Sequence, residues 1–116
     1  MDSQKFKTIL ERLIELGDKE ELDWKPTGVQ YTYLLTLKDS SISISPEFSE
    51  ELGCSMYAFQ FRNERGDVVE NTYVNEDDAN YGSAEYVYEL AQRKALNSDA
   101  TIDRIIEQLK PDSLAA

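Results

Sequence analysis

The side chains of this 116-residue sequence with the most capacity for chemistry are one cysteine and 23 carboxylates, and there is no histidine. A Ser-His-Asp triad, a Cys-His dyad and a His-ligated metal site are therefore excluded. Cys54 has neither a histidine nor a nearby basic residue in the sequence to activate it. We expect a structural thiol there, because a free cysteine commonly packs as a small apolar residue.

Three consecutive acids, Glu76, Asp77 and Asp78, raise the question of a calcium loop. An EF-hand loop requires oxygen ligands at its first, third and fifth positions and glycine at the sixth. Starting the loop at Asp78 places Gly82 at the fifth position, and starting it one residue earlier places Ala79 at the third. We therefore expect a solvated loop ahead of a helix, where carboxylates favour the helix dipole. No catalytic residue, cofactor or metal site is predicted.

Acidic residues outnumber basic ones by 23 to 12, which gives a net charge of −11. This charge repels nucleic acid and anionic membranes and favours a protein partner with a basic surface. It is equally compatible with imitation of DNA, or with a role in solubility alone. There is no apolar run of about 18 residues and no N-terminal secretory signal, and the lone cysteine fits a reducing compartment. We expect a cytoplasmic protein.

An N-terminal helix over residues 4–16 is predicted by apolar residues at helical spacing, behind Ser3 as the N-cap. Gly17 is placed to end this helix in the left-handed conformation. A charged connector over residues 18–23 leads to Pro26, which cannot continue a helix. The first element is therefore one amphipathic helix with a single apolar side.

Two strands are predicted next, over residues 29–37 and 42–44, because large apolar side chains alternate there with other residues. The short turn between them predicts a hairpin. Pro46 is expected to end the second strand. Residues 47–53 are then an acidic loop around two apolar residues, Phe48 and Leu52.

The third predicted strand contains Tyr57, Phe59 and Phe61 in alternation. A four-residue turn follows and ends at Gly66, where a positive φ is expected. Residues 68–74 form the fourth predicted strand, with Val69 and Tyr73 facing the core. Consecutive strands joined by short connections favour an antiparallel meander, since parallel strands need a crossover.

Two C-terminal helices complete the pattern. Ser83 is expected to cap a helix that extends to Ala95, and Asn97-Ser98 interrupts it. Ile102, Ile105, Ile106 and Leu109 predict a short final helix that stops before Pro111. We expect one domain over residues 1–110 and a frayed tail over residues 111–116.

The predicted fold is therefore α+β: an N-terminal helix, a four-stranded antiparallel β-meander, and two C-terminal helices packed on one sheet face. That face is expected to hold Tyr31, Tyr33, Leu35, Ile42, Ile44, Phe59, Phe61 and Val69. The covering helices are expected to contribute Leu10, Leu13, Leu90 and Ile106.

Three tyrosines cluster around the start of the second helix. Tyr86 and Tyr88 lie about 200° apart on a helix, so one of them should be exposed. Exposed tyrosines beside acids are typical of protein-binding surfaces, although an amphipathic core boundary explains them as well. The predicted partner-binding residues are these tyrosines and the acids of the two loops: Glu47, Glu50, Glu51, Glu76, Asp77, Asp78, Tyr81, Tyr86 and Tyr88.

Two segments support a resemblance: Leu22-Asp23-Trp24-Lys25 after the first helix, and residues 88–99 with the isoleucines that follow. In these segments and in layout the chain resembles a group of small acidic bacterial and phage proteins of uncharacterised function. In style it is similar to toxin-immunity proteins and anti-defence inhibitors, which work by occluding a partner. This resemblance implies no substrate and assigns no site.

Three functions remain open. The first is a non-catalytic protein-binding module, an inhibitor or immunity-like protein that covers a basic surface. A DNA mimic is the second, and it requires a continuous negative stripe instead of an apolar or aromatic centre. A small enzyme or ligand-binding protein is the third, and it requires a concave pocket with convergent polar groups.

Overall fold

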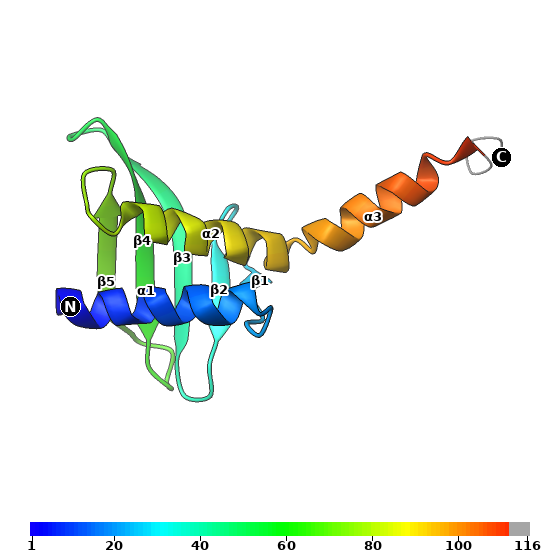
Figure 1. The fold of residues 1–116 in the computed structure, drawn as a ribbon. Coiled ribbons are helices and arrows are strands. Elements are labelled where there is room, and N and C mark those ends of the chain that lie inside the picture. Colours follow the sequence, from blue (N-terminus) through cyan, green and yellow to red (C-terminus); the bar gives the residue numbers. More distant parts are fainter. Residues whose placement is uncertain (112–116) are drawn as a thin grey trace.

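The computed structural model describes residues 1–111 and has three helices and five strands in that part of the chain (Figure 1). In chain order these are α1 (Ser3–Asp18), β1 (Lys25–Pro26), β2 (Tyr33–Thr36), β3 (Ser41–Ser49), β4 (Cys54–Arg62), β5 (Val68–Asn75), α2 (Tyr81–Ala95) and α3 (Ser98–Gln108). The α+β class and the order of helix, sheet and two helices are as predicted. The strand number is five, because the two-residue β1 pairs with β2.

The sheet is an antiparallel meander with the strand order β1-β2-β3-β4-β5. Its central pair is β3 with β4, where Ile42 lies opposite Phe61 and Ile44 opposite Phe59. All four of these side chains are buried. The alternation that predicted the two strands therefore also placed their apolar side chains on one face.

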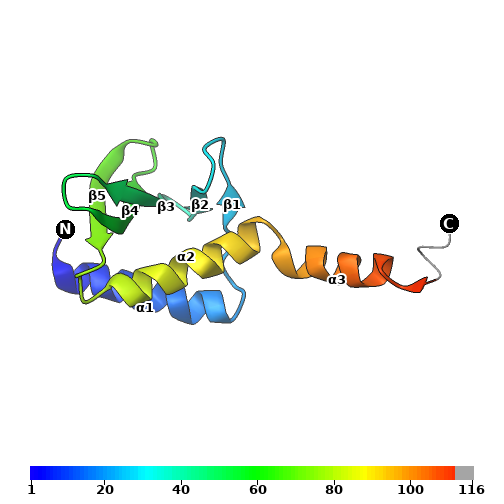
Figure 2. The ribbon, with the colours of Figure 1, turned by 90° about the horizontal axis from the view of Figure 1, so that it is seen from above.

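Helices α1 and α2 lie side by side across that face and leave the other face open (Figures 1 and 2). Phe6 of α1 meets Phe59 edge to face, with ring centroids 5.1 Å apart, which is a favoured aromatic geometry. The core between the two layers consists of Phe6, Leu10, Leu13, Trp24, Tyr33, Leu35, Ile42, Ile44, Phe59, Phe61, Val74, Ala84, Val87, Tyr88 and Ala91.

Helix α1 begins and ends differently from the prediction. Its N-cap is Asp2, whose carboxylate accepts from the backbone N–H of Gln4 at 2.7 Å. Gly17 was expected to end the helix in the left-handed conformation, but it lies inside α1, and the positive φ falls at Glu20. A Cβ at Gly17 would lie 2.9 Å from Leu90 Cδ1. The glycine therefore allows α2 to approach α1 closely.

The first predicted strand is shorter than expected. Val29 and Tyr31 lie in a turn, where Tyr31 has φ 65° and both side chains are exposed. Tyr31 was therefore wrongly assigned to the core face. The second predicted strand is longer, because Pro46 lies within β3 opposite Tyr57. β2 pairs with β3 only as far as Ile44, so β3 is an edge strand at Pro46, where a missing N–H is tolerated.

The fourth predicted strand exists as β5, but its orientation was wrong. Val69 and Tyr73 are exposed, and Val74 is buried. A bulge at Phe61/Arg62 pairs Arg62 with Val68 and Phe61 with Glu70, so that Val69 is skipped. A one-residue shift of register exchanges the two faces of a strand. The bulge therefore turned outward the residues that a regular hairpin would bury.

Helix α3 was expected to cover the sheet, and it does not. It extends away from the two-layer body (Figures 1 and 2), and none of its residues is buried. The radius of gyration is 16.9 Å, compared with about 13 Å for a compact domain of this length. The described residues contain no helix with the length and apolarity needed to cross a membrane. The predicted tail, residues 111–116, lies outside the described residues except for the exposed Pro111.

Candidate functional site

The two acidic loops predicted to bind a partner lie at the same end of the sheet. The turn between β3 and β4 precedes the start of β4, and β5 ends beside that start, with Asn75 opposite Met56 (Figure 1). The backbone N–H of Ser55 donates to Glu76 Oε1 at 2.6 Å. The meander therefore brings together acids that lie more than twenty positions apart in the sequence.

Short hydrogen bonds fix the shape of both loops. In the β3–β4 turn, Gly53 N–H donates to the Ser49 carbonyl at 2.8 Å, and Gly53 has φ 63°. In the β5–α2 loop, Asn75 Oδ1 accepts from Asp77 N–H at 3.0 Å, and Asp78 Oδ1 accepts from Asn80 N–H at 2.8 Å. Such side-chain to backbone bonds replace strand or helix bonds in turns. The acids are therefore held on ordered loops.

Two large apolar side chains lie among these acids and are exposed. Phe48 is 63% exposed and Leu52 is 66% exposed. Phe48 is part of the lining of a hollow of about 390 Å³, together with Pro46, Met56 and Tyr81. Residues 47–49 were predicted to lie in a loop, but they form the end of β3. We call this region the acidic end and define it by exposed residues of the β3 end and the two loops, with the tyrosine beside them: Glu47, Phe48, Glu50, Glu51, Leu52, Glu76, Asp77, Asp78 and Tyr81.

The structure separates the three tyrosines that the sequence grouped together. Tyr81 is half-buried at the acidic end, where its ring lies 5.5 Å from that of Tyr57. Tyr88 is buried and donates to the Tyr31 carbonyl at 2.8 Å. Tyr86 is the exposed member of the pair, and its hydroxyl donates to Asp18 of α1. Of the three, Tyr81 is the one that belongs to the acidic end.

Tyr57 and Tyr81 stay protonated at neutral pH, because the pKa of each is raised. Burial, together with the neighbouring Tyr81 and Glu85, raises the pKa of Tyr57 to about 12. Burial is also the main cause that raises the pKa of Tyr81, followed by Glu85 and Glu76. A phenol with a raised pKa is a poor general base. Their chemistry at this end is packing and hydrogen bonding.

Cys54 begins β4 at the same end of the sheet and is a half-buried free thiol opposite Ser49. Within residues 1–111, no three His, Cys, Asp or Glu side chains are grouped so that they could hold a metal ion. In the β5–α2 loop, the carboxylates of Glu76 and Asp78 accept hydrogen bonds from backbone N–H groups. What this end of the molecule offers a ligand is negative charge beside apolar surface.

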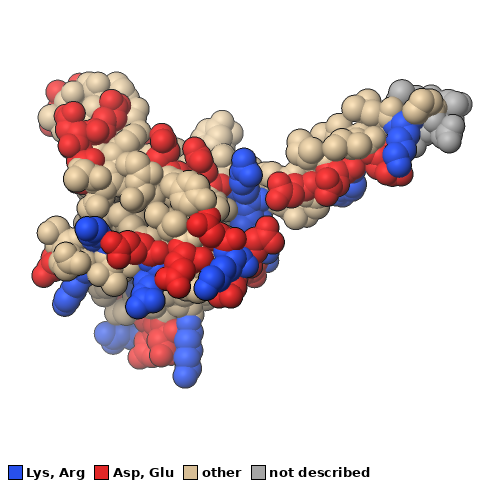
Figure 3. All heavy atoms as spheres, in the orientation of Figure 1, with Lys and Arg blue, Asp and Glu red and all other residues tan. Residues whose placement is uncertain are grey.

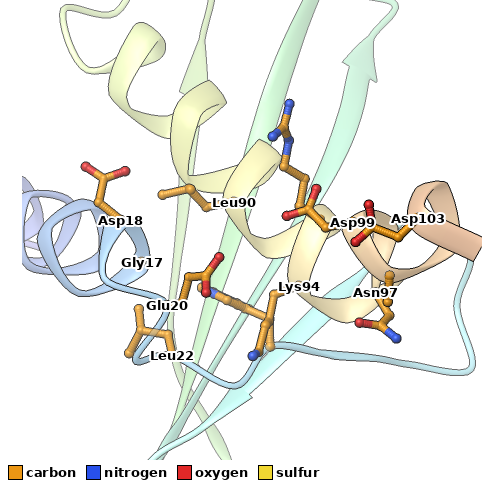
Figure 4. A pocket seen from close by; sticks show the side chains of 12 residues that line it. Gly17, Asp18, Glu20, Leu22, Leu90, Lys94, Asn97, Asp99 and Asp103 are labelled. Atoms are coloured by element: carbon orange, nitrogen blue, oxygen red, sulfur yellow. The ribbon is translucent and has the colours of Figure 1, made fainter. Parts of the chain in front are cut away.

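A second hollow, of about 390 Å³, lies where α1, α2 and α3 meet (Figure 4). Asp99 and Asp103 project from the first turns of α3 on the side of this hollow, and Asp18 and Glu20 line it from the α1 end. Bases are interspersed with these acids. The complete lining is Gly17, Asp18, Glu20, Leu22, Trp24, Leu90, Arg93, Lys94, Asn97, Asp99, Ala100 and Asp103.

The open face of the sheet holds a groove of about 370 Å³ with a polar floor. Arg62 donates from Nη1 to Ser43 Oγ at 3.2 Å and from Nη2 to Gln60 Oε1 at 2.6 Å. Exposed Val29 and Tyr73 are part of its lining. Polar residues between the core positions form this floor: Ser41, Ser43 and Ser45 of β3, and Gln60 and Arg62 of β4. Their types and spacing in the sequence did not indicate a site.

The distribution of charge differs between the helical side and the acidic end. On the face seen in Figure 3, basic and acidic side chains alternate over the helices, whereas the upper left end shows acids without bases. Along α1, Glu15 lies 3.8 Å from both Arg12 and Lys19. On this face the acids of the helical side are therefore interspersed with bases, whereas those at the upper left end are not.

Sequence reasoning identified the acids of this surface and missed its apolar part. Phe48 and Leu52 were placed in the acidic loop but not among the binding residues. The available signal was that two large apolar side chains occur within a run of acids, where a purely solvated loop has no use for them. Comparison with protein-family models, with curated proteins and with solved structures finds no match to this chain.

Proposed function

We propose that this chain is a non-catalytic protein-binding module that covers a basic surface of its partner with the acidic end. The observation that supports this most directly is that Phe48 and Leu52, exposed at 63% and 66%, lie in the same segment as the exposed acids Glu47, Glu50 and Glu51. Protein interfaces commonly have a desolvated apolar centre with a polar rim. The function is occlusion, in the manner of an inhibitor or immunity protein.

The two parts of the surface have different roles in this proposal. The acids attract a basic surface at long range and so accelerate association, an effect that salt weakens. Phe48 and Leu52 are removed from water only once the complex has formed, so they determine how slowly it dissociates. A DNA mimic would depend on its acids alone, because phosphate-like charge needs no apolar centre.

The first experiment identifies the partner and then locates its contact. The chain is immobilised, proteins from the host are captured, and binding kinetics of the identified partner are measured at low and high salt. In one variant Glu76→Gln, Asp77→Asn and Asp78→Asn are combined, which keeps every acceptor oxygen that the loop uses. We expect association to slow by about ten-fold and dissociation to stay unchanged.

The matched control changes the same amount of charge elsewhere. Glu11→Gln, Asp39→Asn and Glu64→Gln together remove three exposed carboxylates outside the acidic end. This control should slow association far less than the loop variant. Equal effects of the two triple variants would mean that only total charge matters, and the acidic end would lose its role.

A second variant tests the apolar centre. Phe48→Ser with Leu52→Ser should speed dissociation by about a hundred-fold or more, because interface centres dominate binding energy. The melting temperature should stay near that of the parent, since both side chains are already exposed. Unchanged dissociation would leave the DNA mimic as the better interpretation.

A further inference from the structure

Helix α3 has a complete apolar stripe that no described part of the chain covers. Ile102, Ile105, Ile106 and Leu109 are between 43% and 63% exposed, and no residue of the helix is buried. At 100° per residue these four side chains fall within an arc of about 100°. An arc of this width is what a core-facing helix presents to its neighbour.

The connection to α2 keeps this stripe away from the body. Asn97 has φ 53° and ψ 45°, the left-handed conformation, which asparagine tolerates better than most residues and which interrupts a helix. The chain therefore changes direction between Ala95 and Ser98, and α3 points away from the sheet (Figure 2). Within residues 1–111, nothing covers the stripe, and a second copy of the chain offers a surface of the same kind.

The stripe is complementary to itself when a second α3 lies antiparallel to it. A two-fold axis midway between positions 105 and 106 places Ile105 opposite Ile106 of the second copy, and Ile102 opposite Leu109 of the second copy. Every large apolar residue of one helix then meets a large apolar residue of the other. A two-fold contact of this kind pairs the same patch on both copies and closes on itself.

The charges beside the stripe fit the same arrangement. Counting 100° per residue, Asp99 and Asp103 lie along one flank of α3, and the uncharged Thr101 and Gln108 lie along the other. Lys110 follows the end of the helix, on the side of the two aspartates by the same count, and its Nζ lies 2.9 Å from Glu107 Oε2. An antiparallel two-fold pair brings like flanks together. Lys110 of the second copy is then level with position 101, between Asp99 and Asp103. A parallel pair would set the charged flank against the uncharged one and gain no such contact.

We propose that the chain forms a homodimer through α3, with the two helices antiparallel and centred between Ile105 and Ile106. Asp99 and Asp103 also line the hollow of Figure 4, so Lys110 of each copy arrives at the mouth of the other copy's hollow. The bodies are attached at opposite ends of the helix pair. The eleven residues of α3 span about 16 Å, twice the screening length of about 8 Å at physiological salt, which limits repulsion between the two acidic bodies.

The interface is small, and the dimer is therefore a reversible one. Four apolar side chains from each copy bury less than the surface of about 1,200 Å² that stable complexes usually exceed. Molar mass should rise toward twice the 13.3 kDa of the chain as the concentration increases from about 10 µM to about 1 mM. Sedimentation velocity or light scattering of the full chain measures this directly.

Two matched leucines test where the contact lies. Leu109 and Leu52 are 63% and 66% exposed, so Leu109→Glu and Leu52→Glu make the same chemical change at similar exposure. Leu109→Glu should raise the dissociation constant of the dimer by about ten-fold or more, and Leu52→Glu should leave it unchanged. Both variants should melt like the parent. Leu52 belongs to the acidic end, so failure of the dimer and failure of the proposed function are separate outcomes.

A charge exchange tests the orientation. Asp99→Lys with Asp103→Lys makes the flank wholly basic, and Lys110→Glu makes it wholly acidic. Each variant alone should dimerise more weakly than the parent, whereas a mixture of the two should restore the dimer, because each basic flank then faces an acidic one. A parent that stays at the mass of one chain up to about 1 mM overturns the proposal. A mixture that gains nothing over the separate variants excludes the antiparallel arrangement.

Discussion

Helices α2 and α3 follow each other in the chain and both have one apolar side, yet their surroundings differ completely. The buried side of α2 consists of two alanines, a valine and a tyrosine, and Gly17 of α1 lies against Leu90. The apolar side of α3 consists of three isoleucines and a leucine, all exposed. The two helices are separated by Leu96 and the left-handed Asn97.

The two helices differ in the size of the residues at their contacts: α2 packs with small residues, Ala84 and Ala91 on its own buried side and Gly17 on α1. Close packing requires that a side chain on one element meets a space on the other, and α1 provides that space for α2 at Gly17. The large residues of α3 fill no such space on the described body, because none of them is buried, whereas a second α3 offers side chains of the same size. An amphipathic pattern indicates which side of a helix is covered. Only the residues of the neighbouring element show what covers it.

The largest expected effect compares one core residue with one residue of the stripe. Phe59 is fully buried against Phe6, so Phe59→Ala should reduce the free energy of unfolding by about 3–5 kcal/mol. Ile106→Ala, in α3, should change it by about 0.5 kcal/mol or less. Urea denaturation at low protein concentration measures both. Equal losses would mean that α3 packs on the body.

A smaller difference is expected within a single strand. Val74 is 1% exposed and Val69 is 60% exposed. Val74→Ala should cost about 2 kcal/mol through lost burial and the cavity left behind. Val69→Ala should stay within about 0.5 kcal/mol. If the order were reversed, β5 would pair without the bulge at Phe61/Arg62, and the core would contain Val69 and Tyr73 as the regular register predicts.

Alkaline pH should weaken the body through its buried phenols. In the unfolded chain a tyrosine ionises near pH 10, whereas burial raises the pKa of Tyr57 to about 12 and that of Tyr88 further. Above pH 10 the unfolded state loses protons that the folded state retains. The stabilisation is therefore complete below pH 10 and is lost as the pH rises toward 12. Melting temperatures across this range should fall, and Tyr57→Phe should make the fall shallower.

The sequence predicted the fold correctly where a pattern of apolar residues is compatible with only one arrangement of the strand or helix. Alternating aromatic and β-branched residues fixed the face of β3 and β4, since a strand has only two faces. The prediction that Val69 and Tyr73 face the core was wrong. The bulge at Phe61/Arg62 turns both side chains to the other face of the sheet, and the alternation of residue types does not reveal it. Pro46 was taken as a strand end, although an edge strand tolerates it.

The candidate site was predictable to a similar extent. Its acids followed from the loops, and the meander explains why Glu50 and Glu76 lie at the same end of the sheet. Phe48 lies in β3 beyond Pro46 and is exposed, which the sequence pattern did not indicate. The helical period correctly predicted that one of Tyr86 and Tyr88 is exposed. It could not predict that the exposed residue, Tyr86, lies beside Asp18 of α1.

A small effect is also expected from the removal of the whole of α3. A chain that ends at Asn97 lacks Ile102, Ile105, Ile106 and Leu109, none of which is buried. Its free energy of unfolding should therefore differ from that of the full chain by about 1 kcal/mol or less.

The free energy of unfolding of this truncated chain should be measured at low protein concentration. Dimerisation stabilises the full chain by mass action, so the difference between the two chains should grow as the concentration rises. A truncation that destabilises the body as strongly as Phe59→Ala, at every concentration, would show that α3 is part of the core. In that case α2 and α3 would be two parts of one packed layer, and the contrast between them would not hold.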